Sequence, residues 1–495
     1  MSTREDQELE SRKAKLVQWE KLGYVTYPVR YERTHSAEEA VALAAKAEVP
    51  TLDGESVPKG KVVAVAGRLM TIRPHGQLWF ATLSDVSGTI QLALVQNVSP
   101  TNVWDLAATL DRGDIVGARG VLVRTKRGEL TVFVTELTPL AKCLELLPEK
   151  WHGLKDVEAR LRQRYVDLLM SPEVRDMFLK KSVFWSTARK ELEAAKFMEV
   201  STPALEAVAG GADATPFKTH HDALDEDFYL RISLELPLKR LMVGGFEKVY
   251  EIGKVFRNEG IDTEHLQDYD MCEFYWGYAN YEDLMNFVEK FYQELVKAVK
   301  GELKTTFDGK EIDWSGTWPR KDYFELIKEL SGVDLAGVTD IKELRQLLEK
   351  HKVRYEESMG AGRLIDLFWK KLVRPKVQGP LFLINHPIEV SPLAKRHPDM
   401  PGRVQRMQVI VAGSELGNGF SELNDPADQK ERFEGQAKLR EAGDSEAMML
   451  DEDYIMALSY GMPPAAGFGF SERLFSFIMD KPIRETVLFP PMRSK

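Results

Sequence analysis

Cysteine is scarce in this chain of 495 residues, which contains only Cys143 and Cys272, far apart in the sequence. That spacing predicts neither a disulfide framework nor a zinc site built from cysteines. No stretch approaches the roughly 18 consecutive apolar residues of a membrane span. The charged N-terminal segment, Met1 to Glu20, also lacks the apolar core of a secretory signal. These absences predict a cytoplasmic protein that does not contact a membrane.

Basic charge is not in excess either, because 77 aspartates and glutamates outnumber 67 lysines and arginines, and the net charge is −10. This balance excludes a generic nucleic-acid coat protein, and we expect no binding to DNA. It leaves RNA binding through a local basic surface open, since the total charge says little about one patch. The length exceeds what one ordinary core supports, so we expect two or three domains.

The N-terminal part of the chain carries short runs that alternate between apolar and polar residues. A helix is expected first, at about residues 3–24, because apolar residues recur there near the helical period. Strands are then expected at 62–72, 78–84, 89–96, 114–125 and 129–137, mostly separated by turn signals. This pattern predicts a small five-stranded barrel, and the OB-fold is a barrel of this kind that binds oligonucleotides. A five-stranded barrel of another type fits the composition almost as well.

From about residue 146 onward, charged helical segments and strands replace the short alternating runs. Helices are expected at 156–170, 173–195, 281–299, 321–332, 340–351 and 361–371. We therefore predict a multidomain α+β protein with an N-terminal helical extension at 1–55, the barrel at 56–148 and one large domain at 149–495. An antiparallel sheet flanked by helices is expected to carry the functional site of the large domain.

The segment from Val249 to Gly260 is the most informative in the chain. It is typical of a strand that places Arg257 and Glu259 on one face, because residues two apart on a strand point the same way. A guanidinium offers forked donors to phosphate or carboxylate oxygens, and a nearby carboxylate accepts hydrogen bonds from an amine. The pair suits a nucleotide, although an isolated Arg-x-Glu is more often a surface ion pair.

Other segments supply the surroundings that favour a site. Gly210 and Gly211 allow a backbone to approach a ligand closely. Glu273 and Tyr275 share one face of a predicted strand, and Phe274 and Trp276 share the other. Segment 413–425 brings together two carboxylates and an amide, and segment 466–473 is a glycine-spaced strand that ends in an arginine at the expected start of a helix.

In this order, the segments resemble the class II aminoacyl-tRNA synthetases, and more narrowly the lysyl-tRNA synthetases of bacterial type. Segments 249–259 and 271–275 resemble the family's motif 2, 197–203 the end of motif 1, and 467–473 motif 3. The matches typical of lysine specificity are 210–221, 389–394 and 415–425, and the likeness covers about residues 5–495. It implies a magnesium-dependent homodimer that converts L-lysine and ATP into lysyl-adenylate and pyrophosphate. The lysine would then pass to the 3′ end of tRNA(Lys).

The resemblance implies a role for each matching position around ATP. Arg257 would bridge the lysine carboxylate and the α-phosphate, and Arg473 would hold the γ-phosphate, so both are expected catalytic residues. The further expected contacts are Glu259 with the adenine amino group, Tyr269 stacked on adenine, His265 at the triphosphate and Glu415 as a magnesium ligand. Gln408 stands where many relatives have a second metal-binding glutamate.

Lysine itself would be held by carboxylates at both of its cationic ends. The expected contacts are Gly211 and Glu235 at the α-ammonium, Arg257 and Asn418 at the carboxylate, and Glu422 and Tyr275, with Glu273 close by, at the ε-ammonium. This allocation agrees with physical chemistry, because burying an ammonium without a partner costs several kcal/mol. A site built for a terminal ammonium should reject analogues that lack it by a factor of roughly 10⁴.

The barrel would then be the anticodon-binding domain of such an enzyme. The positions that match anticodon contacts in relatives are Arg73, Phe80, Gln91 and Glu129. Phe80 would stack on a base and Arg73 would stack or pair with phosphate, while Gln91 and Glu129 would bind base edges, as proteins do with single-stranded RNA. For Phe80 the alternative is packing in the core of the barrel.

Two departures from the family pattern accompany Gln408. Segment 470–473 is one residue shorter than the usual end of motif 3, and Leu266 stands where an asparagine is common.

Two other interpretations of the sequence remain. One is the paralogue that lysylates a protein acceptor, which lacks an N-terminal barrel. The other is a synthetase-like RNA-binding or regulatory protein that no longer activates an amino acid.

Overall fold

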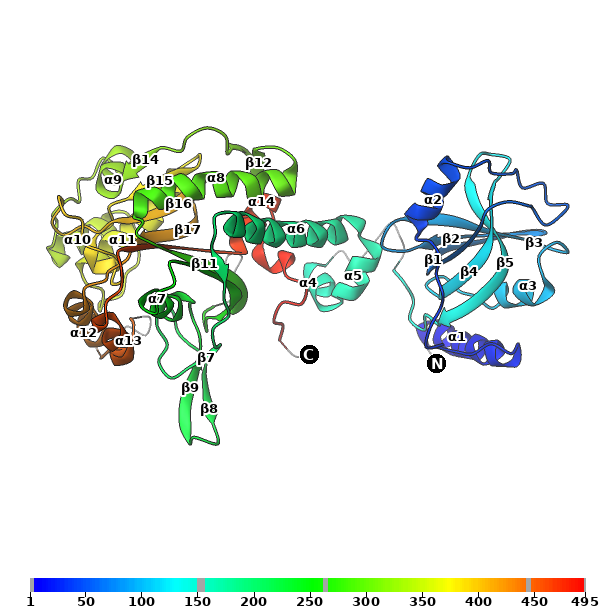
Figure 1. The fold of residues 1–495 in the computed structure, drawn as a ribbon, viewed down its shortest axis with the longest axis horizontal. Helices are drawn as coiled ribbons and strands as arrows, with labels where there is room; N and C mark the ends of the chain where they lie inside the picture. The colour runs from blue at the N-terminus through cyan, green and yellow to red at the C-terminus, as the bar shows by residue number, and fades with distance from the viewer. Residues whose placement is uncertain (1–3, 149–155, 261–265, 442–446, 494–495) are drawn as a thin grey trace. The chain divides into compact units, whose positions relative to one another are not determined.

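A computed structural model describes residues 4–148, 156–260, 266–441 and 447–493. The chain divides into two compact units, Met1–Leu154 and Lys155–Lys495 (Figure 1). Each unit has its own hydrophobic core. No helix among the described residues is long and apolar enough to cross a membrane.

In its described residues, the first unit is a closed five-stranded barrel with three helices. Its elements are α1 (Arg4–Lys21), α2 (Ala37–Ala45), β1 (Val62–His75), β2 (Leu78–Ser84), β3 (Thr89–Val95), α3 (Thr101–Ala107), β4 (Ile115–Arg124) and β5 (Leu130–Ala141). The strand order is β1-β2-β3-β5-β4, and β1 pairs with β4 to close the barrel. The predicted strands are confirmed to within a few residues. The predicted boundary between a 1–55 extension and the barrel stays a prediction.

Alternation along the strands gives the barrel two apolar faces. The inner face includes Leu92, Leu94 and Val132, and the helices α1 and α2 add Trp19 and Ala40 to the same core. The outer face carries a smaller cluster: Leu52, Ala93, Val95, Val121, Val123 and Phe133, with Phe80 packed against its edge. The N-terminal helices are thus part of the barrel's hydrophobic core.

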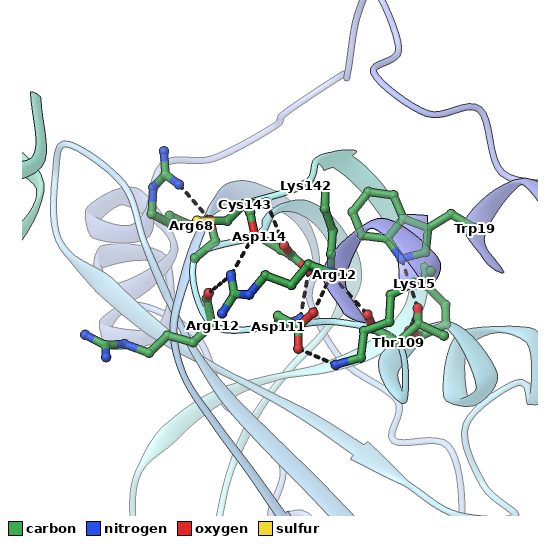
Figure 2. Close-up of polar contacts among 12 residues, drawn as sticks. Arg12, Lys15, Trp19, Arg68, Thr109, Asp111, Arg112, Asp114, Lys142 and Cys143 are labelled. Atoms are coloured by element: carbon green, nitrogen blue, oxygen red, sulfur yellow. Dashed lines mark hydrogen bonds and ion pairs between the residues drawn. The ribbon is translucent and has the colours of Figure 1, made fainter. Parts of the chain in front are cut away.

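A buried polar cluster fastens α1 to the barrel (Figure 2). The ammonium of Lys142 is fully buried and lies between Asp111 and Asp114, at 2.7 and 2.8 Å. It also lies 5.0 Å from the ring centre of Trp19, whose indole N–H donates to Thr109 at 2.9 Å. Such a charge is tolerated inside a protein because both carboxylates compensate it.

The second unit contains the larger sheet. Its strands are β6 (Met198–Glu199), β7 (Leu205–Glu206), β8 (Lys218–His221), β9 (Glu226–Leu230), β10 (Lys248–Phe256), β11 (Asp268–Gly277), β12 (Lys304–Phe307), β13 (Lys310–Asp313), β14 (Arg320–Asp322), β15 (Leu381–Ile384), β16 (Arg406–Val411), β17 (Ser414–Ser421) and β18 (Ala465–Ser471). Its helices are α4 (Val157–Arg162), α5 (Arg164–Met170), α6 (Pro172–Ala194), α7 (Glu235–Val243), α8 (Tyr281–Lys300), α9 (Tyr323–Ser331), α10 (Ile341–Lys350), α11 (Ala361–Phe368), α12 (Pro426–Glu441), α13 (Glu452–Ser459) and α14 (Arg473–Met479). A π-helical turn, Trp369–Val373, extends α11, and short 3-10 turns cover 374–376, 388–390 and 483–486.

Eight strands form the central sheet in the order β14-β15-β16-β17-β18-β11-β10-β6. The pairing is antiparallel except at the two edges, where β14 pairs with β15 and β6 with β10 in parallel. The predicted antiparallel sheet flanked by helices is therefore confirmed. Helices α6, α8 and α14 bury one face, with Phe274, Phe468 and Phe470 at the centre of that core. Helices α7, α12 and α13 pack on part of the other face.

Three predicted elements differ from the structure, and tertiary contacts explain one of the differences. Helix 156–170 is interrupted at Gln163, where the break allows Arg164 to be buried against the backbone carbonyls of Glu485, Val487 and Leu488. The helix predicted at 361–371 ends as α11 at Phe368 and continues as the π-helical turn. Strand β10 ends at Phe256, one residue before Arg257.

Candidate active site

A cavity of about 600 Å³ opens on the sheet face opposite α6, α8 and α14. Strands β11, β16, β17 and β18, helix α7 and the α11 segment contribute its walls. The predicted site residues of this unit that line it are Gly211, Glu235, Arg257, Glu259, Tyr269, Glu273, Tyr275, Gln408, Glu415, Asn418, Glu422 and Arg473. His265 lies outside the described residues. Segments more than 200 positions apart in the sequence thus meet at one site.

The floor of the cavity is a row of paired residues across the sheet. Gln408 on β16 pairs with Asn418 on β17, Asn418 with Gly469 on β18, and Gly469 with Glu273 on β11. A side chain at Gly469 would begin 3.2 Å from Cγ of Glu273. Gly469 therefore leaves room above the centre of the sheet, while the adjacent Phe468 and Phe470 point into the core below.

Glu273 is buried and held by three hydrogen bonds. Its Oε1 accepts from the hydroxyl of Ser233 at 2.7 Å and from the backbone N–H of Leu234 at 3.0 Å. Its Oε2 accepts from the hydroxyl of Tyr275 at 2.9 Å. Burial nevertheless raises the pKa of Glu273, and the hydrogen bonds only partly offset that rise.

Two further carboxylates, Glu235 and Glu422, complete an acidic end of the cavity. Glu235 begins α7, and Glu422 follows β17. Both form ion pairs with Lys239, whose side chain is fully buried. Oε1 of Glu422 accepts no hydrogen bond from any described residue, although it is shielded from water. A buried acceptor without a donor is rare in folded proteins, so this oxygen suits a ligand's N–H.

Two glycines leave room for this acidic end. At Gly467, a Cβ atom would lie 2.3 Å from Oε1 of Glu422 and 2.3 Å from the ring of Tyr275. At Gly211, where φ is +86°, a Cβ atom would lie 3.0 Å from Ser233 and 3.1 Å from Glu235. Only glycine satisfies both the backbone conformation and the close approach at Gly211.

The opposite end of the cavity is cationic and aromatic. Arg257 donates from Nε to the carbonyl oxygen of Ile232 at 3.2 Å, and its guanidinium lies 5.7 Å from the ring centre of Tyr269. The prediction that Arg257 and Glu259 lie within a strand is wrong, because the pairing between β10 and β11 ends at Phe256 and Asp268. Both side chains still line the cavity. They do so from the connection that follows β10.

Arg473 enters the cavity from the first residue of α14. The preceding residue, Glu472, is fully buried and accepts hydrogen bonds from Lys181 of α6 and from the backbone N–H of Asp270. The pairing of β18 with β11, from Gly277–Ala465 to Met271–Ser471, gives the register of the shortened motif. Glu472 therefore anchors the end of β18 immediately before Arg473.

The predicted metal ligands have unequal environments. Glu415 is partly exposed to the cavity, and its Oε2 lies 3.9 Å from Nη1 of Arg374. Gln408 is buried, and its Oε1 lies 3.1 Å from Nε2 of His386. Burial and the nearby Arg406 hold the pKa of His386 well below its usual range, so this imidazole is neutral. Within the described residues, no group of three or more His, Cys, Asp or Glu side chains is placed to hold a metal.

Several cationic side chains of the cavity were not predicted from the sequence. Arg363, Lys370 and Arg374 line the cavity from the α11 segment and the turns that follow it. Successive spacings of seven and four residues place side chains on one face of a helix, and this pattern was visible in the sequence. Arg406 was also missed. It donates from Nε to Oδ1 of Asn418 at 2.7 Å and so orients that amide.

The predicted anticodon residues lie on or beside the barrel strands. Arg73 on β1 pairs with Phe80 on β2, and Phe80 pairs with Ala93 on β3, two residues after Gln91. Phe80 is half-buried, so it has both packing contacts with the outer cluster and an exposed part. Gln91 accepts a hydrogen bond from Thr131 at 2.8 Å, and the exposed Glu129 immediately precedes β5.

The chain matches two protein families, one in each unit. Residues 156–493 match the family described as tRNA synthetases class II (D, K and N), and residues 63–140 match the OB-fold nucleic acid binding domain. The chain belongs to the class II tRNA synthetases, which confirms the predicted family, and its barrel is an OB-fold.

Proteins similar to this chain over nearly its full length are named lysine–tRNA ligases. The chain is 45% identical to the lysine–tRNA ligase of Carboxydothermus hydrogenoformans, over 98% of this chain and 97% of that protein. It is 44% identical to the lysine–tRNA ligase of Moorella thermoacetica and 42% identical to that of Bacillus cereus, again over 98% of this chain and 97% of each relative.

Proposed function

We propose that this protein is a lysine–tRNA ligase that activates L-lysine with ATP and transfers the lysine to the 3′ end of tRNA(Lys). The observation that carries the proposal is the unpaired Oε1 of Glu422, which lies at the acidic end of a cavity whose other end is cationic. An amino acid with two ammonium groups suits the acidic end, and a nucleotide suits the other. The names of the similar ligases support the same substrate.

Lysine occupies the acidic end in this proposal. Its ε-ammonium donates to Glu422, with Tyr275 and Glu273 beside it, and its α-ammonium donates to Glu235 and the backbone of Gly211. Asn418, oriented by Arg406, and Arg257 face the lysine carboxylate. The carboxylates give specificity because an analogue without the terminal ammonium would leave them buried and unpaired.

ATP occupies the cationic end. Glu259 accepts a hydrogen bond from the adenine amino group, and Tyr269 stacks on the base. Arg473 and His265 contact the phosphates. The lysine carboxylate attacks the α-phosphorus while the bond to the bridging β-phosphate oxygen breaks, and pyrophosphate leaves. Positioning and charge neutralisation by Arg257 and Arg473 account for the catalysis, so this step needs no side-chain nucleophile.

A ribose hydroxyl at the 3′ end of tRNA(Lys) then attacks the acyl carbon of the adenylate. AMP leaves with the bonding electron pair, and the hydroxyl proton is released. Arg73, Phe80, Gln91 and Glu129 on the OB-fold barrel bind the anticodon in this proposal. We further infer that the protein acts in the cytoplasm as a homodimer.

Of the two predicted magnesium ligands, Glu415 suits the metal. Glu415 offers a carboxylate to the cavity, and Mg²⁺ is commonly held by one or two carboxylates together with substrate phosphates. Bound magnesium would neutralise phosphate charge. Gln408 is neutral and engaged with His386, so we infer that it contributes less to metal binding than Glu415.

Lysine-dependent exchange of pyrophosphate into ATP tests the proposal directly. We expect exchange with L-lysine and none with L-norleucine, which has the same chain without the terminal ammonium. Absence of exchange with L-lysine would favour the synthetase-like RNA-binding protein. Charging of tRNA(Lys) then separates a tRNA ligase from an enzyme that lysylates a protein acceptor, and the N-terminal OB-fold already argues against that acceptor.

A further inference from the structure

Lys239 is a fully buried lysine immediately behind the acidic end of the cavity. It lies one helical turn after Glu235 on α7, and its ammonium contacts both Glu235 and Glu422. It also lies 5.1 Å from the ring centre of Phe420. The cavity wall formed by the described residues includes Glu235, Glu422 and Phe420, but not Lys239. Lys239 therefore contacts the wall from inside the protein.

The carboxylates at this end of the cavity outnumber the ammonium groups that the described residues place beside them. Three carboxylates, Glu235, Glu273 and Glu422, face a single ammonium, that of Lys239. If the carboxylates are ionised, one ammonium leaves two of them without an ammonium partner of their own. The other titratable or charged groups that interact electrostatically with them are Tyr275 on β11, Tyr454 on α13, Arg406 on β16, Arg257 after β10 and Glu206 on β7.

We propose that Lys239 is a positioning residue for substrate specificity. Its resident ammonium compensates one of the three carboxylates and favours the ionised forms of Glu235 and Glu422, which leaves capacity for two ammonium groups of the substrate. The inference rests on the proposed function, because lysine is the substrate that brings those two groups.

Electrostatics explains why the resident ammonium is needed. Burial raises the pKa of Glu235 to about 7 and that of Glu422 well above its usual range, and Lys239 opposes both rises. Lys239 is the largest influence that opposes burial at both carboxyls, so without it the pKa of each would rise further and protonation would extend to higher pH. A protonated carboxyl cannot attract an ammonium by charge, so lysine binding would weaken.

Lys142 in the barrel provides a matched control. Its ammonium is likewise fully buried between two carboxylates, Asp111 and Asp114, and lies 5.0 Å from an aromatic ring centre, that of Trp19 (Figure 2). This cluster belongs to the other unit and fastens α1 to the barrel. Replacing Lys142 therefore removes the same chemical arrangement without touching the cavity.

The experiment measures lysine and ATP binding to the full-length Lys239→Met and Lys142→Met variants by titration calorimetry at pH 7.0 and pH 8.5. We expect Lys239→Met to raise the Kd for lysine at least about tenfold at pH 7.0, and the loss to shrink at pH 8.5 as the carboxyls ionise. The Kd for ATP should change little. Lys142→Met should leave both constants unchanged.

Two results with Lys239→Met would overturn the inference: unchanged lysine binding, or a loss of equal size at both pH values. If that variant does not fold, the wild-type protein supplies the test, because calorimetry in buffers of different ionisation enthalpy counts released protons. Lysine binding at pH 8 should release less than one proton, and release of one proton or more would overturn the inference. Failure of the wild-type protein to bind lysine would instead overturn the proposed function.

Discussion

The hydroxyl of Tyr275 donates a hydrogen bond to Oε2 of Glu273 over 2.9 Å, which joins two side chains on the cavity face of β11. Ser233 and the backbone of Leu234 occupy the other oxygen of the same carboxylate. Glu273 is therefore fixed from both sides, and the phenol oxygen retains lone pairs that can accept from a ligand. In the proposed function, the two residues form a preset partner for the ε-ammonium of lysine.

Replacing Tyr275 with phenylalanine tests that partnership. The ring against Gly467 would be kept, but Glu273 would lose one of its hydrogen bonds and the substrate an acceptor. We expect KM for lysine to rise about tenfold or more, since a hydrogen bond to a charged group is worth about 1.5–3 kcal/mol. Pyrophosphate exchange at varied concentrations of lysine and of ATP gives KM for each substrate. A rise in KM for ATP of the same size would contradict this assignment.

Gly467→Ala should abolish lysine use while leaving the fold intact. The new Cβ atom would begin 2.3 Å from both Oε1 of Glu422 and the ring of Tyr275, so these side chains would have to move. Gly435→Ala is the matched control, because Gly435 lies within α12 and a Cβ atom there meets nothing within 4 Å. The control should be neutral or stabilise the helix by up to about 1 kcal/mol. If the Gly467→Ala variant kept its affinity for lysine, the close approach of Glu422 and Tyr275 to residue 467 would not be required for lysine binding.

The sequence predicted the sheet and the cavity wall well because both depend on local alternation. Gly467, Phe468, Gly469 and Phe470 alternate between cavity and core, and their pattern is visible in the sequence. Lys239 was not foreseen, because a Glu and a Lys four residues apart are also typical of an exposed helix surface. Its role follows only from the packing of α7 on the sheet, which buries the pair. The break at Gln163 likewise depends on contacts with residues more than 300 positions away.

Glu422→Gln should weaken lysine use far more than ATP use. The amide keeps the shape of the side chain but removes the charge that faces both the substrate and Lys239. We expect kcat/KM for lysine to fall by roughly a factor of 10² or more, which corresponds to a loss of about 3 kcal/mol in transition-state stabilisation. The exposed Glu434 on α12 offers a control, and Glu434→Gln should behave as wild type. Losses of equal size for lysine and ATP would count against Glu422 as the partner of the ε-ammonium.

Lysine affinity should fall as the pH falls through 7. Burial, only partly opposed by Lys239, raises the pKa of Glu235 to about 7, so this carboxyl is ionised above that pH and protonated below it. In the proposed function, the α-ammonium of lysine pairs with the ionised form of this carboxyl. We expect the Kd for lysine to rise by up to roughly tenfold per pH unit below 7, with a much smaller change for ATP. Direct binding at pH 6, 7 and 8 measures this slope, and a flat profile would contradict the assignment of Glu235.

Phe80→Leu separates stacking on RNA from packing in the barrel. Phe80 is half-buried against the outer cluster that includes Ala93 and Phe133, and leucine preserves apolar contact there while removing the aromatic face. Stacking of one base on an aromatic ring is worth about 1–3 kcal/mol, so the Kd for tRNA(Lys) should rise by roughly five- to 150-fold. Lysine-dependent pyrophosphate exchange should stay unchanged, because the barrel is a separate unit from the one that holds the cavity. If tRNA affinity stayed the same while the barrel lost thermal stability, Phe80 would be a packing residue, and the anticodon surface would have to be sought on other barrel side chains.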